Sequence, residues 1–238
     1  MTLKDLKRDL RAAADTGRAA LLARYFKTGK GEYAEGDKFL GLTVPATRGI
    51  ANKYKDLPLT DVQNLLSSPW HEERLCALLL LVEKFGKGGA AERKKIYRLY
   101  LAKTRSINNW DLVDLSAPRL VGGWLRDRSR KPLYRLAGSK LLWDRRIAML
   151  ACFNFIYDGE SADALAIARL LLDDEHDLMH KAVGWMLRET GKRCSEKLLL
   201  AFLKDNYARL PRTTLRYAIE KFPPKKRKAL LAGNFQPL

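Results

Sequence analysis

The segment that decides the fold reads Asn108-Asn109-Trp110-Asp111-Leu112-Val113-Asp114-Leu115-Ser116-Ala117-Pro118. Asn109 is a favoured helix N-cap, and Asp111 falls in the first turn, where the helix dipole favours negative charge. Pro118 lacks the N–H that would bond to the Asp114 carbonyl, so we predict a helix that bends or stops there. Trp110 and Asp114 are four residues apart and share one face of this helix. An aromatic residue and an acid displayed together above a bend indicate a functional site.

Three other predicted helices begin in a related way: Trp70-His71-Glu72-Glu73-Arg74, Trp143-Asp144-Arg145-Arg146 and Asp177-Leu178-Met179-His180-Lys181. The four starts are separated by roughly 30–45 residues, a spacing typical of degenerate HEAT-like helical repeats. We therefore predict an all-α HEAT-like solenoid with a basic concave groove, formed by a single domain over residues 1–238. Aligning the starts makes Arg74, Arg146 and Lys181 equivalent to Asp114, which places a lone carboxylate in a row of cations.

Nearly every other segment also has helical periodicity. The expected helices cover residues 3–14, 19–26, 68–85, 90–103, 129–138, 141–157, 162–172, 176–190 and 213–222, with further helices capped by Thr43 and Ser195. Residues 29–37 form a loop, and residues 86–89 and Gly191 end helices. No linker is long enough to separate independent domains.

The composition predicts an acidic partner. The chain has 45 Lys and Arg against 27 Asp and Glu, a formal net charge of +18, which favours nucleic acid first and an anionic membrane second. The longest apolar run, residues 75–82, is far too short to span a membrane. The charged N-terminus shows no signal peptide, and three widely spaced cysteines indicate reduced thiols, so we expect a cytoplasmic protein.

Basic residues are concentrated on and after the last two related helices. They are Arg145, Arg146, Lys181, Arg188, Lys192 and Arg193, followed by Arg212, Arg216, Lys221 and residues 225–228. Such side chains bind phosphates without reading the base sequence. Residues 225–228 have an equally good interpretation as a solvated helix end.

A tryptophan in a helical pattern is more often a core residue than a ligand contact. Trp185 differs because Lys181 and Arg188 flank it on one helix face, an arrangement that suits packing against a sugar or base beside phosphates. The pair His176 and His180 has the spacing of a zinc motif. The only other imidazole, His71, is distant in the sequence, so we expect no metal site.

At Asn109-Trp110-Asp111-Leu112-Val113-Asp114 the chain resembles the AlkD-type DNA alkylation repair enzymes, a family of HEAT-like repeat DNA glycosylases. Other segments also resemble this family, in the same order: Ala23-Arg24-Tyr25, Phe39-Leu40-Gly41-Leu42-Thr43-Val44-Pro45, Trp143-Asp144-Arg145-Arg146 and Lys181-Ala182-Val183-Gly184-Trp185-Met186-Leu187-Arg188-Glu189. The ordered set extends over most of the chain.

The resemblance implies removal of N3- and N7-alkylated purines from double-stranded DNA. It implies that Asp114 is the catalytic carboxylate and that Trp110 and Trp185 pack on the damaged nucleotide. It also implies that Arg146, Arg188 and Tyr25 hold the strand near the lesion, without base flipping. Lys181 and Arg145, from the basic set above, are further candidate DNA contacts. We expect a monomer without cofactor, in the cytoplasm and associated with the nucleoid when bound to DNA.

The chemistry fits these residues. Ordinary glycosidases need two carboxylates because a neutral leaving group must be protonated. An alkylated purine is already cationic, so one carboxylate suffices to stabilise the sugar cation and orient water. Two indole faces would add about 0.5–2 kcal/mol each of cation–π attraction if desolvated.

Two alternatives stay open at this stage. The first is a non-catalytic HEAT-like binder of damaged or branched DNA, suggested by the net charge and by Asn109, which replaces a bulky aromatic found in similar enzymes. The second is a protein-binding solenoid whose basic face meets an acidic partner. Steeply salt-dependent affinity for duplex DNA would count against the second.

Overall fold

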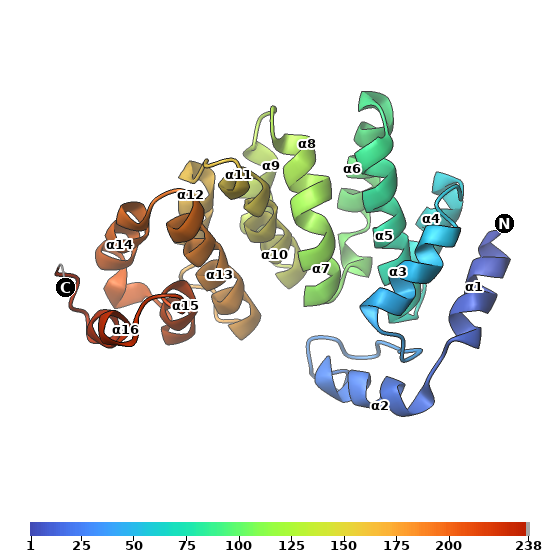
Figure 1. The fold of residues 1–238 in the computed structure, drawn as a ribbon, viewed down its shortest axis with the longest axis horizontal. Helices are drawn as coiled ribbons and strands as arrows, with labels where there is room; N and C mark the ends of the chain where they lie inside the picture. Colours follow the sequence, from blue (N-terminus) through green and yellow to red (C-terminus); the bar gives the residue numbers. More distant parts are fainter. Residues whose placement is uncertain (237–238) are drawn as a thin grey trace. The chain divides into compact units, whose positions relative to one another are not determined.

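The computed structural model describes residues 1–236, and its regular structure is helical (Figure 1). Within these residues no strand forms, apart from an isolated bridge between Lys38 and Trp70. The predicted all-α class is therefore confirmed, and successive packed helices are consistent with a helical-repeat solenoid. The chain divides into two compact units, Met1–Ser116 and Ala117–Leu238. The expectation of one continuous domain stays a prediction.

The first unit is built around α5 (His71–Lys87), whose middle turns are almost wholly apolar and buried. Helices α3, α4 and α6 pack directly on α5, and α1 packs on α3, α4 and α5. The bounds of the other helices are α1 Leu3–Ala12, α2 Thr16–Tyr25, α3 Val44–Lys53, α4 Leu59–Leu66, α6 Ala90–Ala102, η1 Thr104–Ser106 and α7 Trp110–Ala117.

The second unit is built around α13 (Asp177–Arg193), which packs against α10, α11, α12, α14 and α15. Its other helices are η2 Pro118–Gly122, α8 Gly123–Leu125, α9 Lys131–Ala137, α10 Leu142–Ala151, α11 Phe153–Tyr157, α12 Ala162–Leu170, α14 Glu196–Asp205, η3 Tyr207–Arg209, α15 Arg212–Ala218 and α16 Pro224–Leu231. Gly184 permits α13 to pack closely on α15, because a Cβ there would lie 2.5 Å from the Tyr217 Cβ and 2.6 Å from the Thr214 carbonyl oxygen.

The helix predicted at Trp110 begins and ends as expected. Asn109 Oδ1 accepts the Trp110 N–H at 2.8 Å, and α7 ends at Ala117. Pro118 then starts a π-helical turn, in which the Gly123 N–H donates to the Pro118 carbonyl. The missing proline N–H thus ends α-helical bonding while the chain continues helically.

Several predicted helix boundaries were wrong. The helix expected from Ser68 starts at His71, because the Trp70 N–H donates to Ser68 Oγ and the His71 N–H to the Lys38 carbonyl. Residues 141–157 form two helices that meet at Cys152. Gly191 does not end α13; the missing side chain makes room for Leu199, which would lie 2.4 Å from a Cβ there. The helices α4 and α16 were not predicted.

None of the helices within residues 1–236 combines the length and apolar character that a membrane crossing requires. The thiols of Cys76 and Cys152 are buried and that of Cys194 is partly buried, and none forms a disulfide. Burial, with a smaller contribution from Glu73, raises the pKa of Cys76 to about 12. This thiol is therefore uncharged at neutral pH and is not an activated nucleophile.

Gly41 is expected to tolerate no side chain. Its φ is +89°, and an added Cβ would lie 2.0 Å from the Asp15 carbonyl oxygen. We expect Gly41→Ala to lower the free energy of unfolding by at least about 2 kcal/mol, measured by urea denaturation. Gly49→Ala is the control, since that helical position has open space around it; it should stabilise the protein by about 0.5–1 kcal/mol. Similar losses for both variants would contradict this explanation.

Candidate active site

Trp110 and Asp114 lie in the first two turns of α7, and both side chains are partly exposed. The Trp110 ring contacts Tyr25 at the end of α2, edge to face, with ring centroids 6.1 Å apart. Tyr25 is 64% exposed. The first unit therefore brings three of the predicted site residues onto two adjoining segments, α2 and α7, that are distant in the sequence.

A row of stacked rings supports Trp110 from behind. Phe26 lies 5.3 Å from Trp110 and 5.2 Å from Phe39, measured between ring centroids. Phe39 stacks in turn on the imidazole of His71 at 4.5 Å. Phe26 and Phe39 are buried, so this side of Trp110 is packed, while the residue as a whole stays partly exposed. The row connects Trp110 to the first residue of α5.

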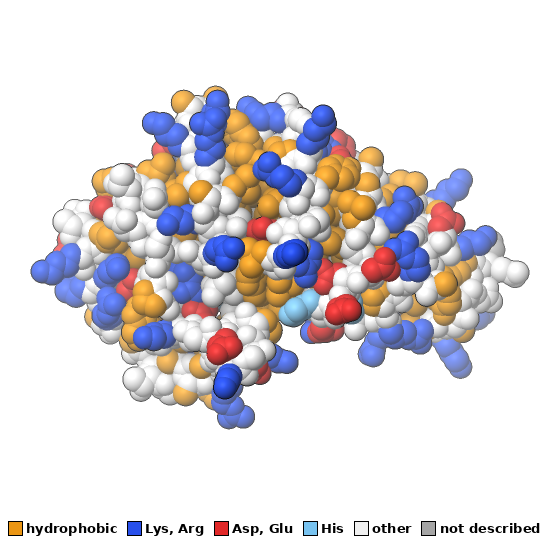
Figure 2. Space-filling model, turned by 180° about the vertical axis from the view of Figure 1, so that it is seen from behind, with side chains coloured by type: hydrophobic (Ala, Val, Ile, Leu, Met, Phe, Trp, Pro, Cys, Tyr) orange, Lys and Arg blue, Asp and Glu red, His pale blue; other side chains and the backbone are white. Residues whose placement is uncertain are grey.

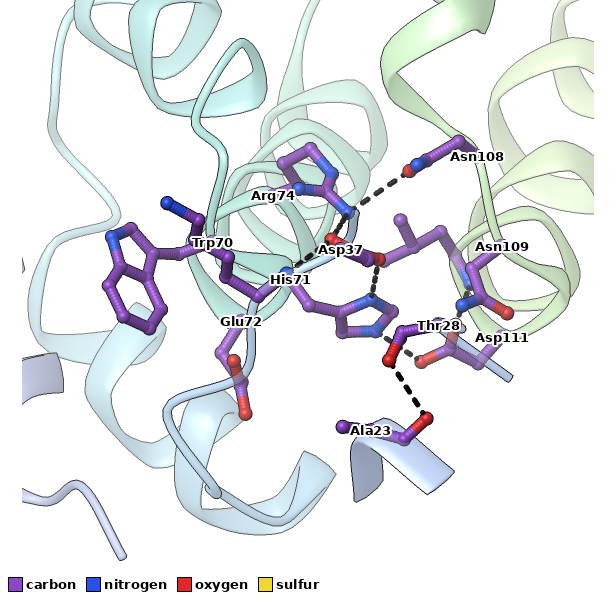
Figure 3. A network of polar contacts seen from close by, with 12 residues as sticks. Ala23, Thr28, Asp37, Trp70, His71, Glu72, Arg74, Asn108, Asn109 and Asp111 are labelled. Atoms are coloured by element: carbon purple, nitrogen blue, oxygen red, sulfur yellow. Dashed lines mark hydrogen bonds and ion pairs between the residues drawn. The ribbon is translucent and has the colours of Figure 1, made fainter. Parts of the chain in front are cut away.

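His71 lies at the centre of a buried network of charged groups (Figure 3). Its Nδ1 is 3.1 Å from Asp37 Oδ2, and its Nε2 is 2.9 Å from Asp111 Oδ2. Arg74 completes the network by donating to Asp37 Oδ1 at 2.6 Å and to Asn108 Oδ1 at 3.0 Å. The network joins the segment after α2 to α5 and to the first turn of α7.

The electrostatics of this network favour its charged form. Burial opposes a charge on His71, but the carboxylates of Asp111 and Asp37 outweigh it and raise the pKa of His71 to about 9. For Asp37, burial is likewise opposed by His71 and Arg74, and the pKa of the carboxyl is lowered. At neutral pH the network therefore consists of an imidazolium, a guanidinium and two carboxylates.

The interpretation of Arg74 as a groove cation was wrong. Its side chain is only 5% exposed, and its guanidinium is occupied by Asp37, Asn108 and the Ser68 carbonyl. Arg74 thus fixes the polypeptide on both sides of α5, and it does not extend toward a phosphate.

The sequence did not predict the structural roles of two further acids at the start of α5. Glu72 is 1% exposed, and its carboxylate accepts the N–H groups of Leu40, Gly41 and Leu42 at 2.8, 2.8 and 3.2 Å. Glu73 is fully buried and pairs with Lys7 and Arg11 of α1, both at 3.1 Å. Glu72 therefore holds residues 40–42 and Glu73 holds α1, while His71 and Arg74 share Asp37.

The inner face of α7 is fixed to α6. Tyr100 is fully buried; its hydroxyl donates to Ser116 Oγ at 2.8 Å, and Ser116 donates to the Leu112 carbonyl at 2.6 Å. Burial, with a smaller contribution from the charge of Asp114, raises the pKa of Tyr100. The hydrogen bond between Tyr100 and Ser116 therefore anchors α7, the helix that carries Asp114, to α6.

The second unit presents the other predicted tryptophan. Trp185 is partly exposed on α13, and its ring lies 6.1 Å from that of Phe153. Arg188, one turn further along, pairs with Glu189 and with Glu220, which lies in the turn after α15. Lys181, one turn earlier, pairs with Asp177 at 2.7 Å and is 39% exposed. The predicted face with Lys181, Trp185 and Arg188 is thus formed, and both of its cations have acidic neighbours.

The side chains of Arg145 and Arg146 are less exposed than those of surface cations. Arg145 pairs with Asp174 at 2.6 Å and donates to the carbonyls of Ser139 and Lys140, both at 3.0 Å. Arg146 is 4% exposed and donates to the Leu178 carbonyl. Both residues connect α10 to neighbouring segments, and their contact with DNA stays a prediction.

Cations are more numerous than acids on the face drawn in Figure 2. The cations of the second unit whose side chains are exposed include Arg216, Lys221, Lys225 and Lys228. Residues 225–228, whose interpretation was open, form part of α16, with Lys226 paired to Glu196 at 2.5 Å.

His176, which caps α13, and His180 within it have structural roles. His176 Nδ1 accepts the Leu178 N–H at 3.1 Å as the helix cap, and His180 Nε2 contacts the Asp174 carbonyl. Within residues 1–236 no group of three or more His, Cys, Asp or Glu side chains is arranged to hold a metal ion.

The family model described as "DNA alkylation repair enzyme" matches residues 6–222. The chain belongs to this family. Membership implies DNA as substrate or partner.

A solved structure is similar as well. It is named "Predicted DNA alkylation repair enzyme from Enterococcus faecalis", and its TM-score is 0.68 at 16% sequence identity, covering 89% of this chain and 97% of that one. At this identity the likeness concerns the fold. No curated protein matched the chain.

The stability of the first unit should depend on pH through His71. Because folding raises the pKa from 6.5 to about 9, the imidazolium stabilises the fold fully below pH 6.5, and this contribution is lost as the pH rises through 9. We expect the free energy of unfolding in urea to fall by roughly 1–3 kcal/mol between pH 6.5 and 9.5. His71→Gln should remove this dependence. An equal decline in wild type and variant would contradict the assignment.

Proposed function

We propose that this protein is an AlkD-type DNA glycosylase that hydrolyses the N-glycosidic bond of cationic N3- and N7-alkylated purines in double-stranded DNA. The observation that carries the proposal is the joint exposure of Trp110, Asp114 and Tyr25 on a firmly supported face. The +18 net charge supports a polyanionic substrate.

The reaction needs only what this face offers. As the bond between C1′ and the purine nitrogen breaks, its electron pair moves to the cationic base, which leaves as a neutral molecule. The sugar becomes an oxocarbenium-like cation, which the Asp114 carboxylate stabilises electrostatically. A water molecule oriented by Asp114 attacks C1′ and releases its proton to the solvent. The indole of Trp110 adds cation–π attraction to the developing charge.

The remaining roles are distributed over the two units. Tyr25 would pack beside Trp110 against the damaged nucleotide. On the second unit, Trp185 would pack on the backbone, and the cations would hold phosphates; these are Arg145, Arg146, Lys181 and Arg188. Phosphate must replace the acidic partners of Lys181 and Arg188 when DNA binds. We therefore expect a moderate affinity for DNA, which decreases as the salt concentration rises. The protein would act as a monomer without cofactor.

The test is release of 7-methylguanine from a duplex that carries it at one position. Wild-type protein should release the base and leave an abasic site. Tight duplex binding with no release would instead support the alternative, a non-catalytic binder of damaged or branched DNA. Comparing its affinity for junction, flap and plain duplex DNA would then establish which structure it prefers.

A further inference from the structure

We infer that His71 is a positioning residue for the proposed site, acting as a doubly protonated imidazolium that holds the first turn of α7 in place. This inference rests on the proposed function for its effect on catalysis. Its structural part, the charge and contacts of His71, can be tested separately.

The charge state follows from the geometry. A carboxylate only accepts hydrogen bonds, and each ring nitrogen of His71 faces a carboxylate oxygen, at 3.1 Å from Asp37 and 2.9 Å from Asp111. Both nitrogens must therefore carry a proton, which makes the ring a cation. The side chain is 3% exposed, and Phe39 stacks on it at 4.5 Å. Water is thus unavailable to replace either partner.

The contact with Asp111 transmits this constraint to the site. Asp111 directly follows Trp110, and its Oδ1 accepts the Leu112 N–H at 2.8 Å while its Oδ2 faces His71. The carboxylate is therefore held from both sides. Since Trp110 and Asp114 belong to the same two turns, their positions depend on this contact.

The contact with Asp37 positions the other member of the Tyr25–Trp110 pair, Tyr25. Asp37 is held by His71 and Arg74, and Phe39, two residues later, stacks on both His71 and Phe26. Phe26 packs on Trp110 and adjoins Tyr25. A single imidazolium thus links the segments that present both aromatic rings.

The charged groups that face His71 are Asp37 from the segment after α2 and Asp111 from α7, with Arg74 of α5 acting through Asp37. When the imidazolium loses a proton, one N–H remains for two carboxylates. Arg74 still compensates Asp37, so Asp111 is the carboxylate that loses a donor, at its Oδ2. The first turn of α7 should then loosen while the remainder of the first unit stays folded.

The catalytic test uses the complete chain and the rate of 7-methylguanine release in single turnover. In wild type the rate should fall at alkaline pH, with a midpoint near 9. His71→Gln should lower the rate at pH 7.5 at least tenfold, leave the affinity for undamaged duplex within twofold, and abolish the alkaline fall. Asp111→Asn should move the midpoint to lower pH. A uniform loss at every pH, with no alkaline fall in wild type, would show a merely structural role and overturn the inference.

A second measurement is independent of any activity. Nitrogen NMR of the three imidazoles at pH 8 should show two N–H groups on His71. The His71 signals are those that are missing from the spectrum of His71→Gln, and His176→Gln is the control for this assignment. In His71→Gln at pH 7, the amides of Val113 and Asp114 should exchange with solvent at least tenfold faster than in wild type. If His71→Gln does not fold, Asp111→Asn replaces it in this measurement. A ring nitrogen without a proton at pH 8, or unchanged exchange, would overturn the inference even if no base is ever released. If these results hold and no base is released, the proposed function alone fails.

Discussion

Asp114→Asn is expected to lower the single-turnover rate of 7-methylguanine release by about 10²–10³-fold. The substitution keeps the shape of the side chain and removes the negative charge that stabilises the sugar cation, and losses of this size follow removal of one electrostatic contact to a transition state. Affinity for undamaged duplex should stay equal or increase, because an acid near phosphates is removed. Quenched time courses with protein in excess over DNA measure the rate directly.

Asp56→Asn is the matched control, since Asp56 is exposed in the first unit and distant in sequence from α7. It should release the base at the wild-type rate. Equal rates for wild type and Asp114→Asn would remove Asp114 from the catalytic role.

Glu72→Ala is expected to have the largest effect on stability, a loss of roughly 3–5 kcal/mol in the free energy of unfolding. Glu72 is a buried carboxylate that accepts three backbone N–H groups, of Leu40, Gly41 and Leu42. Removing it leaves these donors without partners away from water. Glu72→Gln, which retains one acceptor oxygen, should lose less.

Urea denaturation at pH 7 measures these differences, with Glu83→Ala as the control. Glu83 lies on the same helix, is 45% exposed and pairs with Lys87 at the surface, so its removal should cost less than about 1 kcal/mol. Comparable losses for the two alanine variants would show that the buried carboxylate does not anchor residues 40–42.

The sequence predicted the helices and one face of the site because these depend on local periodicity. Residues four apart share a helix face whatever the tertiary structure, so Trp110 and Asp114 could be paired from the sequence alone. Pro118 ended the α-helical bonding for an equally local reason. Tyr25 could be placed only through the family resemblance, because its contact with Trp110 joins α2 to α7.

The network at the start of α5 could not be predicted in the same way. His71, Glu72, Glu73 and Arg74 are four consecutive polar residues, a pattern typical of a solvated helix start. In the structure they are buried because each has its partner elsewhere, and the partners of His71 lie 34 and 40 residues away. Sequence spacing carries no information on such pairs, which is why Arg74 was mistaken for a phosphate-binding cation.

In the proposed reaction one carboxylate suffices because the leaving base is already cationic. The most direct test compares single-turnover release of 7-methylguanine, a cationic lesion, with release of hypoxanthine, a neutral one, from otherwise identical duplexes by wild-type protein. We predict release of 7-methylguanine that depends on Asp114 and no measurable release of hypoxanthine. Release of both bases at similar rates, or of neither, would contradict the claim.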